Sequence, residues 1–312
     1  MTQKIAIIGA GLIGLSWAIT FARAGFRVDI FDSQDDATLK APDKIDSACT
    51  ALAEIGLMSP KLRDETCARI AVAQDMAGAV EGAKYVQENT PEDAAIKRAI
   101  FAELDRLADS TAIIASSTSA LMPSEFTEGL PGADRCLVAH PLNPPHLIPA
   151  VELVPGPETS ETTMQRAADL MAEIGQSPIR TTREVEGFIM NRLQGALLDE
   201  AFALVEQGLA MPADVDTAMR DGLARRWVFM GPFATIDLNA PGGVTDFVAR
   251  YGKSYERIGA HRPNRTDWFG PVTAKIAVAL DSGDRAGRAE RRDTSLARLA
   301  HFIGEQKKED HG

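Results

Sequence analysis

The sequence has few of the features that mark secreted, metal-binding or nucleic-acid-binding proteins. Its three cysteines, Cys49, Cys67 and Cys136, are widely separated and form no Cys-x-x-Cys pair. Neither a disulfide framework nor a zinc site is therefore expected. The formal net charge of −11 argues against a nucleic-acid partner, because such a partner requires a basic face. These absences favour a protein of a reducing compartment that binds no metal and no nucleic acid.

Long apolar runs are also absent. No run approaches the roughly eighteen residues of a membrane span, and the first predicted strand starts by Lys4, which leaves no room for a signal peptide before it. The 312 residues are 45% hydrophobic, which is enough for a large core and for two domains. We therefore expect a globular cytoplasmic protein with no membrane partner.

The first thirty residues contain a glycine-rich turn in the context that binds dinucleotides. An apolar strand-like run, residues 4–8, leads directly into Gly9-Ala10-Gly11-Leu12-Ile13-Gly14, and apolar residues then recur at helical spacing. Gly9 permits the tight turn, Gly11 lets a pyrophosphate approach the backbone, and Gly14 lets the helix and strand pack closely. The amino end of the helix then faces the phosphates.

Asp32 follows a second strand-like run, residues 27–31. A carboxylate at this point accepts hydrogen bonds from both hydroxyls of the adenosine ribose and repels a 2′-phosphate. The next four residues, Ser33 to Asp36, supply no arginine to offset that repulsion. The sequence therefore predicts NAD rather than NADP as the cofactor. A glycine-rich turn in another α/β protein is the alternative, and the strand-turn-helix context disfavours it.

Residues 139–154 place one imidazole and one carboxylate on two strand-like runs. His140 ends the first run and Glu152 lies in the second, with four prolines between them that prevent a helix. A carboxylate that accepts a hydrogen bond from one imidazole nitrogen selects the tautomer and raises the basicity of the other nitrogen, as a general base requires. Taken alone, the pair is equally consistent with a buried histidine and a strand-edge glutamate.

Hydroxyl side chains follow another predicted strand, residues 112–115. Ser116-Ser117-Thr118-Ser119 comes directly after it, and open α/β sheets bind ligands at the carboxyl ends of their strands. A loop or a helix cap is the ordinary alternative for such a cluster.

The apolar pattern changes from strands to helices at about residue 185. Helices are expected near residues 186–208, 214–223, 231–238, 244–251, 271–280 and 291–303. Residues 40–73 are expected to form a helix-loop-helix excursion from the sheet. We therefore predict an α/β protein in which a doubly wound, Rossmann-type NAD-binding domain, residues 1–184, precedes an all-helical substrate and dimerisation domain, residues 185–312.

These motifs occur together in an order that resembles the 3-hydroxyacyl-CoA dehydrogenase superfamily. The dinucleotide fingerprint, Ser-Ser-Thr-Ser-Ala, His-Pro-Leu-Asn-Pro-Pro, the Glu152 strand and Gly187 to Arg192 cover nearly the whole chain. Residues 86–93, 140–154 and 226–232 are most similar to the lambda-crystallin or L-gulonate 3-dehydrogenase branch, and carnitine dehydrogenases are close relatives of it.

The resemblance implies roles for individual residues. His140 and Glu152 become a catalytic pair, which Ser119 and Asn191 complete by hydrogen-bonding the reacting oxygen. An asparagine amid an apolar helix suits such a task, although an interhelical hydrogen bond is the simpler interpretation. NAD contacts are implied at Leu12, Ile13, Asp32, Glu92 and Lys97, beside the three glycines of the turn.

The resemblance also implies a reaction: NAD-dependent oxidation of the 3-hydroxyl of a small hydroxy acid such as L-gulonate, by a homodimer paired through the helical domain. Arg226 matches an arginine of the acid-oxidising branch, although it is equally expected to pair with an acid such as Asp221. The alternatives are a 3-hydroxyacyl-CoA or carnitine dehydrogenase, and a structural NAD-binding protein without turnover. The complete set of Ser119, His140, Glu152 and Asn191 argues against the last of these.

Overall fold

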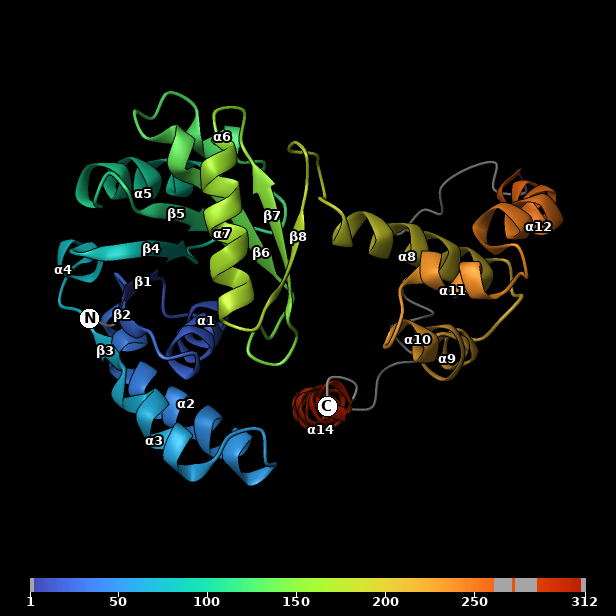
Figure 1. Ribbon diagram of the computed structural model, residues 1–312, viewed down its shortest axis with the longest axis horizontal. Coiled ribbons are helices and arrows are strands. Elements are labelled where there is room, and N and C mark those ends of the chain that lie inside the picture. Colours follow the sequence, from blue (N-terminus) through green and yellow to red (C-terminus); the bar gives the residue numbers. More distant parts are fainter. Residues whose placement is uncertain (1–2, 261–270, 273–284, 310–312) are drawn as a thin grey trace. The chain divides into compact units, whose positions relative to one another are not determined.

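The computed structural model describes residues 3–260, 271–272 and 285–309, and it divides the chain into two compact units (Figure 1). The first unit comprises Met1–Asn191 together with Ala286–Gly312, and the second comprises Arg192–Arg285. The first break lies seven residues after the predicted boundary at residue 184. The last helix groups with the first unit, whereas the sequence pattern alone assigned it to the helical domain.

The first unit is built around an eight-stranded sheet with the strand order β3-β2-β1-β4-β5-β6-β7-β8. All neighbours from β3 to β6 pair in parallel, β7 runs antiparallel to β6, and β8 runs parallel to β7. This arrangement confirms the predicted doubly wound sheet. The strands are β1 (Lys4–Ile8), β2 (Arg27–Phe31), β3 (Ile70–Val72), β4 (Ala83–Glu88), β5 (Ile113–Ser116), β6 (Cys136–Pro141), β7 (Ala150–Pro155) and β8 (Ser177–Arg180).

One strand was not predicted from the sequence. The excursion after β2 forms the two expected helices, α2 (Asp35–Glu54) and α3 (Pro60–Ala68), but it ends in β3 at the sheet edge. This strand has only three residues, two of them exposed, so no alternation of apolar and polar residues marks it.

Three of the remaining helices of the first unit, α4, α5 and α7, begin at residues whose side chains accept from their first amides. Asp93 accepts hydrogen bonds from the amides of Ala95 (2.8 Å) and Ile96 (3.0 Å) at the start of α5, and Ser160 accepts one from Thr163 at the start of α7. α1 differs, because Gly11 caps it without a side chain. The remaining helices are α1 (Leu12–Arg23), α4 (Met76–Val80), α5 (Ala94–Leu107), α6 (Ser124–Thr127) and α7 (Glu161–Glu173), with a 3-10 turn at Ala133–Arg135.

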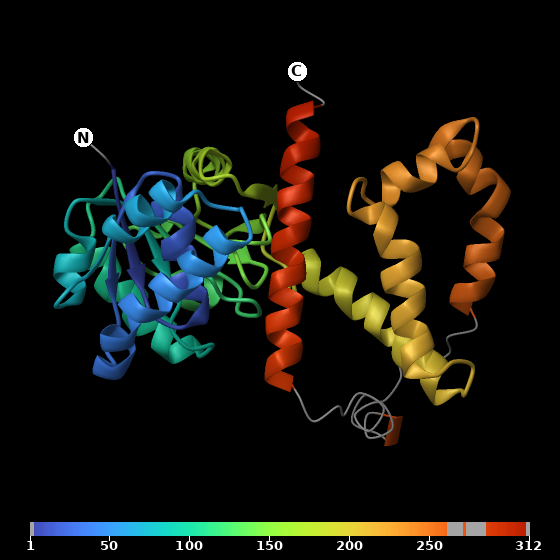
Figure 2. The same ribbon diagram turned by 90° about the horizontal axis from the view of Figure 1, so that it is seen from below.

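Helices cover both faces of the sheet (Figures 1 and 2), and each face holds its own hydrophobic core. In β1, Ile5 and Ile7 pack into one core with Trp17 and Phe21 of α1, whereas Ile8 packs into the other core beside Phe101 of α5. Because side chains alternate between the faces of a strand, a strand buried on both faces is apolar throughout. The continuous apolar runs in the sequence have this origin.

The second unit is helical throughout its described residues, as predicted. Its helices are α8 (Met190–Glu206), which starts in the first unit, α9 (Pro212–Thr217), a π-helical stretch (Ala218–Leu223), α10 (Ala224–Trp227), α11 (Pro232–Leu238) and α12 (Gly243–Ala260). The helix expected at residues 271–280 falls mostly outside the described residues. The helix expected at residues 291–303 lies within α14 (Arg285–Glu309). Within the described parts of the chain, no helix has the length and apolarity that a bilayer crossing requires.

His146 lies on the connection between β6 and β7. Its Nδ1 shares a hydrogen bond with the hydroxyl of Ser16 on α1. Burial and, to a smaller extent, the nearby Arg23 guanidinium lower the pKa of His146 to about 4, although Asp293 of α14 acts in the opposite direction. The imidazole is therefore neutral in the folded protein near neutral pH.

We expect His146 to make the stability of the fold depend on pH. The unfolded chain takes up a proton near the ordinary histidine pKa of 6.5, whereas the folded chain does so only near 4. Between these values the unfolded state binds more protons, so the free energy of unfolding falls as the pH is lowered through this window. Because the side chain is partly exposed, we expect a loss of roughly 2 kcal/mol.

Urea unfolding of the wild type and of His146→Gln at about pH 7 and about pH 4.5 measures this loss. The wild type should lose roughly 2 kcal/mol more than the variant. Equal losses in the two proteins would show that His146 titrates normally.

Candidate active site

The glycines of the first turn have three different surroundings. Gly9 has a φ of +99°, and a Cβ there would lie 2.8 Å from the carbonyl oxygen of Asn89. A Cβ on Gly14 would clash with the carbonyl oxygen of Gly9, whereas a Cβ on Gly11 would meet no atom within 4 Å. Gly9 and Gly14 therefore allow close packing of the protein itself, and Gly11 faces open space, where a ligand can approach the backbone.

A cavity of about 480 Å³ opens beside this turn. Asp32 is fixed at its wall, because its Oδ2 accepts from the Ala10 amide (2.7 Å) and its Oδ1 accepts from the Gln34 amide (2.9 Å). The cavity is lined by Ile8, Gly9, Gly11, Phe31, Asp32, Ser33, Gln34, Met76, Asn89, Thr90, Pro91, Ile96 and Ile100.

The cavity has the properties that an adenine dinucleotide requires. The first amides of α1 lack a side-chain cap, so they are available to a pyrophosphate, with the exposed Leu12 and the partly buried Ile13 in the same turn. Apolar residues flank the space for an adenine ring, and Asp32 is placed for ribose hydroxyls. The lining contains no lysine or arginine, which fits a cofactor without a 2′-phosphate.

Glu92 binds the loop that follows β5. Its carboxylate accepts from the Thr118 hydroxyl and, at 3.3 to 3.4 Å, from the amides of Ser119, Ala120 and Leu121. Desolvation raises the pKa of Glu92, but these hydrogen bonds and the charge of Lys97 outweigh it, so the pKa lies below its ordinary value. Glu92 therefore holds the serine-rich loop in place, and a direct contact with NAD stays a prediction.

Lys97 occupies a different environment from the one its predicted role suggested. It is 1% exposed, and its Nζ donates to both oxygens of the fully buried Glu88 (2.9 Å each) and to the Thr90 carbonyl (3.1 Å). An ammonium has three donors, and all three are engaged here. Glu88 also accepts from the Ser116 hydroxyl (2.6 Å). In this arrangement Lys97 supports the Thr90 loop at the edge of the cofactor cavity, and a direct contact with NAD stays a prediction.

His140 and Glu152 lie directly opposite each other on the antiparallel strands β6 and β7. Both are buried, and His140 Nδ1 is 2.8 Å from Glu152 Oε2. A carboxylate accepts only, so Nδ1 carries the proton and the neutral ring keeps its lone pair on Nε2. This is the tautomer that a general base needs.

The second oxygen of Glu152 binds the backbone that enters α8. Oε1 accepts from the amides of Ile189 (2.7 Å) and Met190 (2.8 Å). The preceding residue, Phe188, has a φ of +49° and is fully buried, and its ring centroid lies 5.7 Å from that of His140. A left-handed phenylalanine costs on the order of 1–3 kcal/mol, so surrounding contacts must hold this turn in place.

Ser119 and Asn191 are brought together as predicted for residues of one site. Asn191 Nδ2 donates to the carbonyl oxygen of Ser119 at 2.7 Å, and Asn191 directly follows the residue whose amide binds Glu152. The Ser119 hydroxyl forms no hydrogen bond within the part of the chain that the structure describes. A continuous set of contacts therefore links His140, Glu152, Asn191 and Ser119.

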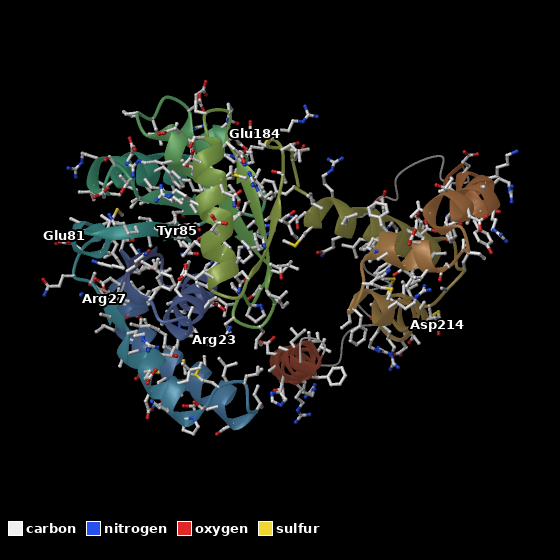
Figure 3. All side chains as sticks on the ribbon, viewed as in Figure 1. Arg23, Arg27, Glu81, Tyr85, Glu184 and Asp214 are labelled. Atoms are coloured by element: carbon white, nitrogen blue, oxygen red, sulfur yellow. The ribbon has the colours of Figure 1, made fainter. Side chains whose placement is uncertain are left out.

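A buried polar network beside the site was not anticipated from the sequence. Tyr85, labelled in Figure 3, donates to Gln87 Oε1 (2.6 Å), and Gln87 Nε2 donates to the Ser117 hydroxyl (2.7 Å). Ser117 also accepts from Trp17 Nε1 (3.1 Å) and donates to Asn89 Oδ1 (2.7 Å). The network orients Asn89 at the cofactor cavity. A glutamine inside the strand-like run 83–88 was its only visible signal.

Arg226 belongs to the second unit and is exposed. Asp221, its expected partner, instead pairs with Arg220 (2.7 Å) and Arg225 (3.8 Å). The Arg226 guanidinium has no ion-pair or hydrogen-bond partner among the described residues. The interpretation of Arg226 as a structural ion-pair residue is therefore wrong.

Comparison with protein families accounts for nearly the whole chain. Residues 4–185 match the NAD-binding domain of 3-hydroxyacyl-CoA dehydrogenase, and residues 187–268 match its C-terminal domain. The chain belongs to the 3-hydroxyacyl-CoA dehydrogenase family. It is accordingly an NAD-dependent oxidoreductase that acts on CH–OH groups, and the predicted cofactor is confirmed.

Individual relatives place the chain in one branch of the family. Lambda-crystallin of Oryctolagus cuniculus is 40% identical over 303 residues, covering 95% of each chain. An L-carnitine dehydrogenase of Streptomyces griseus is 37% identical over 307 residues, covering 97% of this chain and 90% of its own. A solved structure of 5-formyl-3-hydroxy-2-methylpyridine 4-carboxylic acid 5-dehydrogenase, an NAD+-dependent dismutase, has a TM-score of 0.81 at 29% identity, covering 97% of this chain and 98% of its own.

We expect Lys97 of this dehydrogenase to act on stability more than on chemistry. Lys97→Met leaves the buried Glu88 carboxylate without its cation, which typically costs about 3–5 kcal/mol. The double variant Glu88→Gln/Lys97→Met removes both charges and should regain most of that loss. Urea unfolding measures both effects. A loss below about 1 kcal/mol in the single variant would contradict the importance of the pair.

The same double variant separates the two roles considered for Lys97. If Lys97 only supports the Thr90 loop, the Glu88→Gln/Lys97→Met variant should bind NAD with nearly wild-type affinity. A strongly weakened affinity in a stable double variant would establish a direct contact with the cofactor.

Proposed function

We propose that the protein oxidises the 3-hydroxyl of a small free hydroxy acid, L-gulonate or a close analogue, to the 3-keto acid, with NAD as the hydride acceptor. The observation that carries the mechanism is the buried pair of His140 and Glu152, whose geometry leaves the Nε2 lone pair free. The observation that carries the substrate class is the guanidinium of Arg226, which has no ion-pair or hydrogen-bond partner among the described residues.

The proposed reaction is balanced by one proton transfer and one hydride transfer. The O–H proton of the substrate passes to His140 Nε2 while the C3–H bond breaks and the carbon-oxygen double bond forms. When bound, NAD supplies the nicotinamide C4 that accepts the hydride. His140 therefore ends the step as an imidazolium, and its later deprotonation returns the site to its starting state.

Glu152 is suited to stabilise that imidazolium. Backbone amides at the start of α8 hold its other oxygen, so the carboxylate is fixed without a cation that would neutralise its charge. A fixed carboxylate beside the ring is placed to stabilise the positive charge that the ring acquires during proton transfer. The same contact prevents the ring from turning, which keeps Nε2 aimed in one direction.

Ser119 and Asn191 are suited to position the reacting oxygen. The Ser119 hydroxyl has no hydrogen-bond partner among the described residues. The Asn191 amide donates one N–H to the Ser119 carbonyl and has a second N–H to donate. Two donors on one oxygen hold the carbinol carbon at the hydride acceptor and stabilise charge as the carbonyl forms.

Three observations support a free acid as the substrate. A guanidinium can bind a carboxylate bidentately, and that of Arg226 has no partner within the part of the chain that the structure describes. Two relatives are named for substrates that carry a free carboxylate, carnitine and a pyridine carboxylic acid. Most basic residues of the α2–α3 excursion are paired with acids, in Lys40–Asp36, Lys61–Glu65, Arg63–Asp46, Arg63–Asp64 and Arg69–Glu65. That surface therefore offers little positive charge to the phosphates of a CoA thioester.

We also propose that two copies pair through the helical unit and that the protein works in the cytoplasm. The second unit exposes many large apolar side chains, among them Leu209, Phe229, Phe233 and Leu238. Such a concentration on a monomer indicates a surface that another protein covers, and the family resemblance makes a second copy the expected partner.

Replacing His140 by Gln tests the mechanism. Loss of a positioned general base should lower kcat by about two to four orders of magnitude. NAD affinity should stay close to that of the wild type, because His140 lies outside the cofactor cavity. Stopped-flow turnover and NAD titration measure the two effects. A variant that kept most of its turnover, or lost NAD binding equally, would show that the histidine is structural.

Replacing Arg226 by Met tests the substrate class, and Arg225→Met is a matched control because Arg225 is already paired with Asp221. Loss of a bidentate charged contact should lower kcat/KM on the preferred acid by about 10- to 100-fold, and the control should change little. The comparison uses L-gulonate, 3-hydroxybutyrate, carnitine and 3-hydroxybutyryl-CoA. A thioester as the best substrate, or an unchanged Arg226→Met, would overturn the free-acid proposal.

A further inference from the structure

The first unit contains a second cavity, of about 370 Å³, that has no residue in common with the cofactor cavity. This second cavity lies at the carboxyl end of α1, whereas Gly11 of the cofactor cavity lies at the amino end. Roughly 18 Å of helix separates Gly11 from the second cavity. Its lining combines the end of α1, the β6–β7 connection, the turn after α7 and one face of α14. The lining residues are Arg23, Leu57, Pro145, His146, Leu147, Ile148, Pro149, Gly175, Gln176, Leu296, Leu299, Ala300 and Ile303.

Arg23 gives this cavity its charge. It is labelled in Figure 3 at the end of α1, and among the described lining residues it is the only permanent cation. Its guanidinium has no ion pair or hydrogen bond within the described chain. Burial lowers its pKa, but an arginine stays protonated under ordinary conditions. A half-buried cation without a partner is unfavourable unless an anion joins it.

Among the residues that the structure describes, no group supplies that anion. Cys49 is the titratable group that acts most strongly on Arg23. Burial raises the pKa of the Cys49 thiol to about 12, so this thiol carries no negative charge near neutral pH. Asp293 of α14 influences His146 less than Arg23 does, and it forms no ion pair with Arg23. His146 is neutral as well, because burial lowers its pKa to about 4.

The remainder of the wall is mainly apolar, with one unsatisfied polar atom. Leu57, Leu147, Ile148, Leu296, Leu299 and Ile303 supply aliphatic surface. Gln176 is 6% exposed, its Nε2 donates to the Pro145 carbonyl (3.2 Å), and its Oε1 has no hydrogen-bond partner. An ionised carboxylate has no donor for this oxygen, so Gln176 contributes to the shape of the wall and the charge that can attract a ligand is that of Arg23.

We propose that this cavity binds a monocarboxylate with an aliphatic body, with the carboxylate on Arg23 and the chain against the leucine and isoleucine side chains. One guanidinium matches one carboxylate, and apolar walls around a few polar groups are typical of small-molecule sites. A dianion such as a phosphate would leave its second charge against aliphatic side chains. The site is independent of the proposed oxidation, because none of its residues belongs to the catalytic set.

Octanoate is the probe for this proposal. Calorimetric titration into the full chain in the absence of NAD should show saturable binding at millimolar affinity or better. Arg23→Met keeps the length of the side chain and removes its charge, so binding should weaken by about 10- to 100-fold. Arg98→Met is the matched control, because Arg98 is exposed, unpaired among the described residues and outside both cavities. It should bind octanoate as the wild type does.

Two further arms separate this site from the alternatives. Ala300→Trp fills the cavity without touching the charge and should abolish binding, while NAD affinity in the same variant shows that the fold is intact. Octanol lacks the charge and should bind at least about 10-fold more weakly than octanoate. The proposal fails if octanoate does not bind, if binding survives both Arg23→Met and Ala300→Trp, or if octanol binds equally well.

Discussion

The carboxylate of Glu152 is the group on which the rest of the site depends. One oxygen fixes the tautomer of His140, and the other gathers the amides at the start of α8. The residue before these amides, Phe188, has a left-handed backbone conformation. Asn191 then emerges beside Ser119. The Glu152 carboxylate thus orients His140 and also binds the backbone amide next to Asn191.

Other carboxylates along the carboxyl edge of the sheet also hold loops in place. Asp32 binds amides of the first turn, Glu88 holds Lys97 and the Thr90 loop, and Glu92 holds the loop after β5. Each loop is ordered by an acid that accepts from backbone or side-chain donors, and among the described residues no cluster of potential metal ligands takes part. This explains why an acidic chain can bind an anionic cofactor. The acids near the cofactor cavity are largely occupied by donors, and uncapped amides of α1 face the phosphates.

Patterns local in sequence predicted much of this arrangement. The glycine turn and Asp32 were recognisable because strand, turn and helix are contiguous, and the pairing of His140 with Glu152 followed from two adjacent strands whose register the structure supplies. The three-residue strand β3 has too few residues for a periodic signal. Lys97 is predicted to contact NAD, but its ion pair with Glu88 was not predicted, because it depends on how the turn between β4 and α5 folds. The left-handed conformation of Phe188 could not be predicted either, because a phenylalanine rarely has a positive φ and its residue type gives no sign of one.

The division of the chain into two units is consistent with a fold that is shared by relatives named for different substrates. Every residue linked to His140 lies in the first unit, up to Asn191, whereas Arg226 lies in the second. Proton and hydride transfer need the same base and the same oxygen donors for any secondary alcohol. Discrimination between a free acid, a quaternary ammonium acid and a thioester depends on groups that meet the rest of the substrate. The base and the oxygen donors therefore do not distinguish one such substrate from another, and under the proposed function, in which Arg226 binds the substrate carboxylate, Arg226 is the position that tests the substrate class.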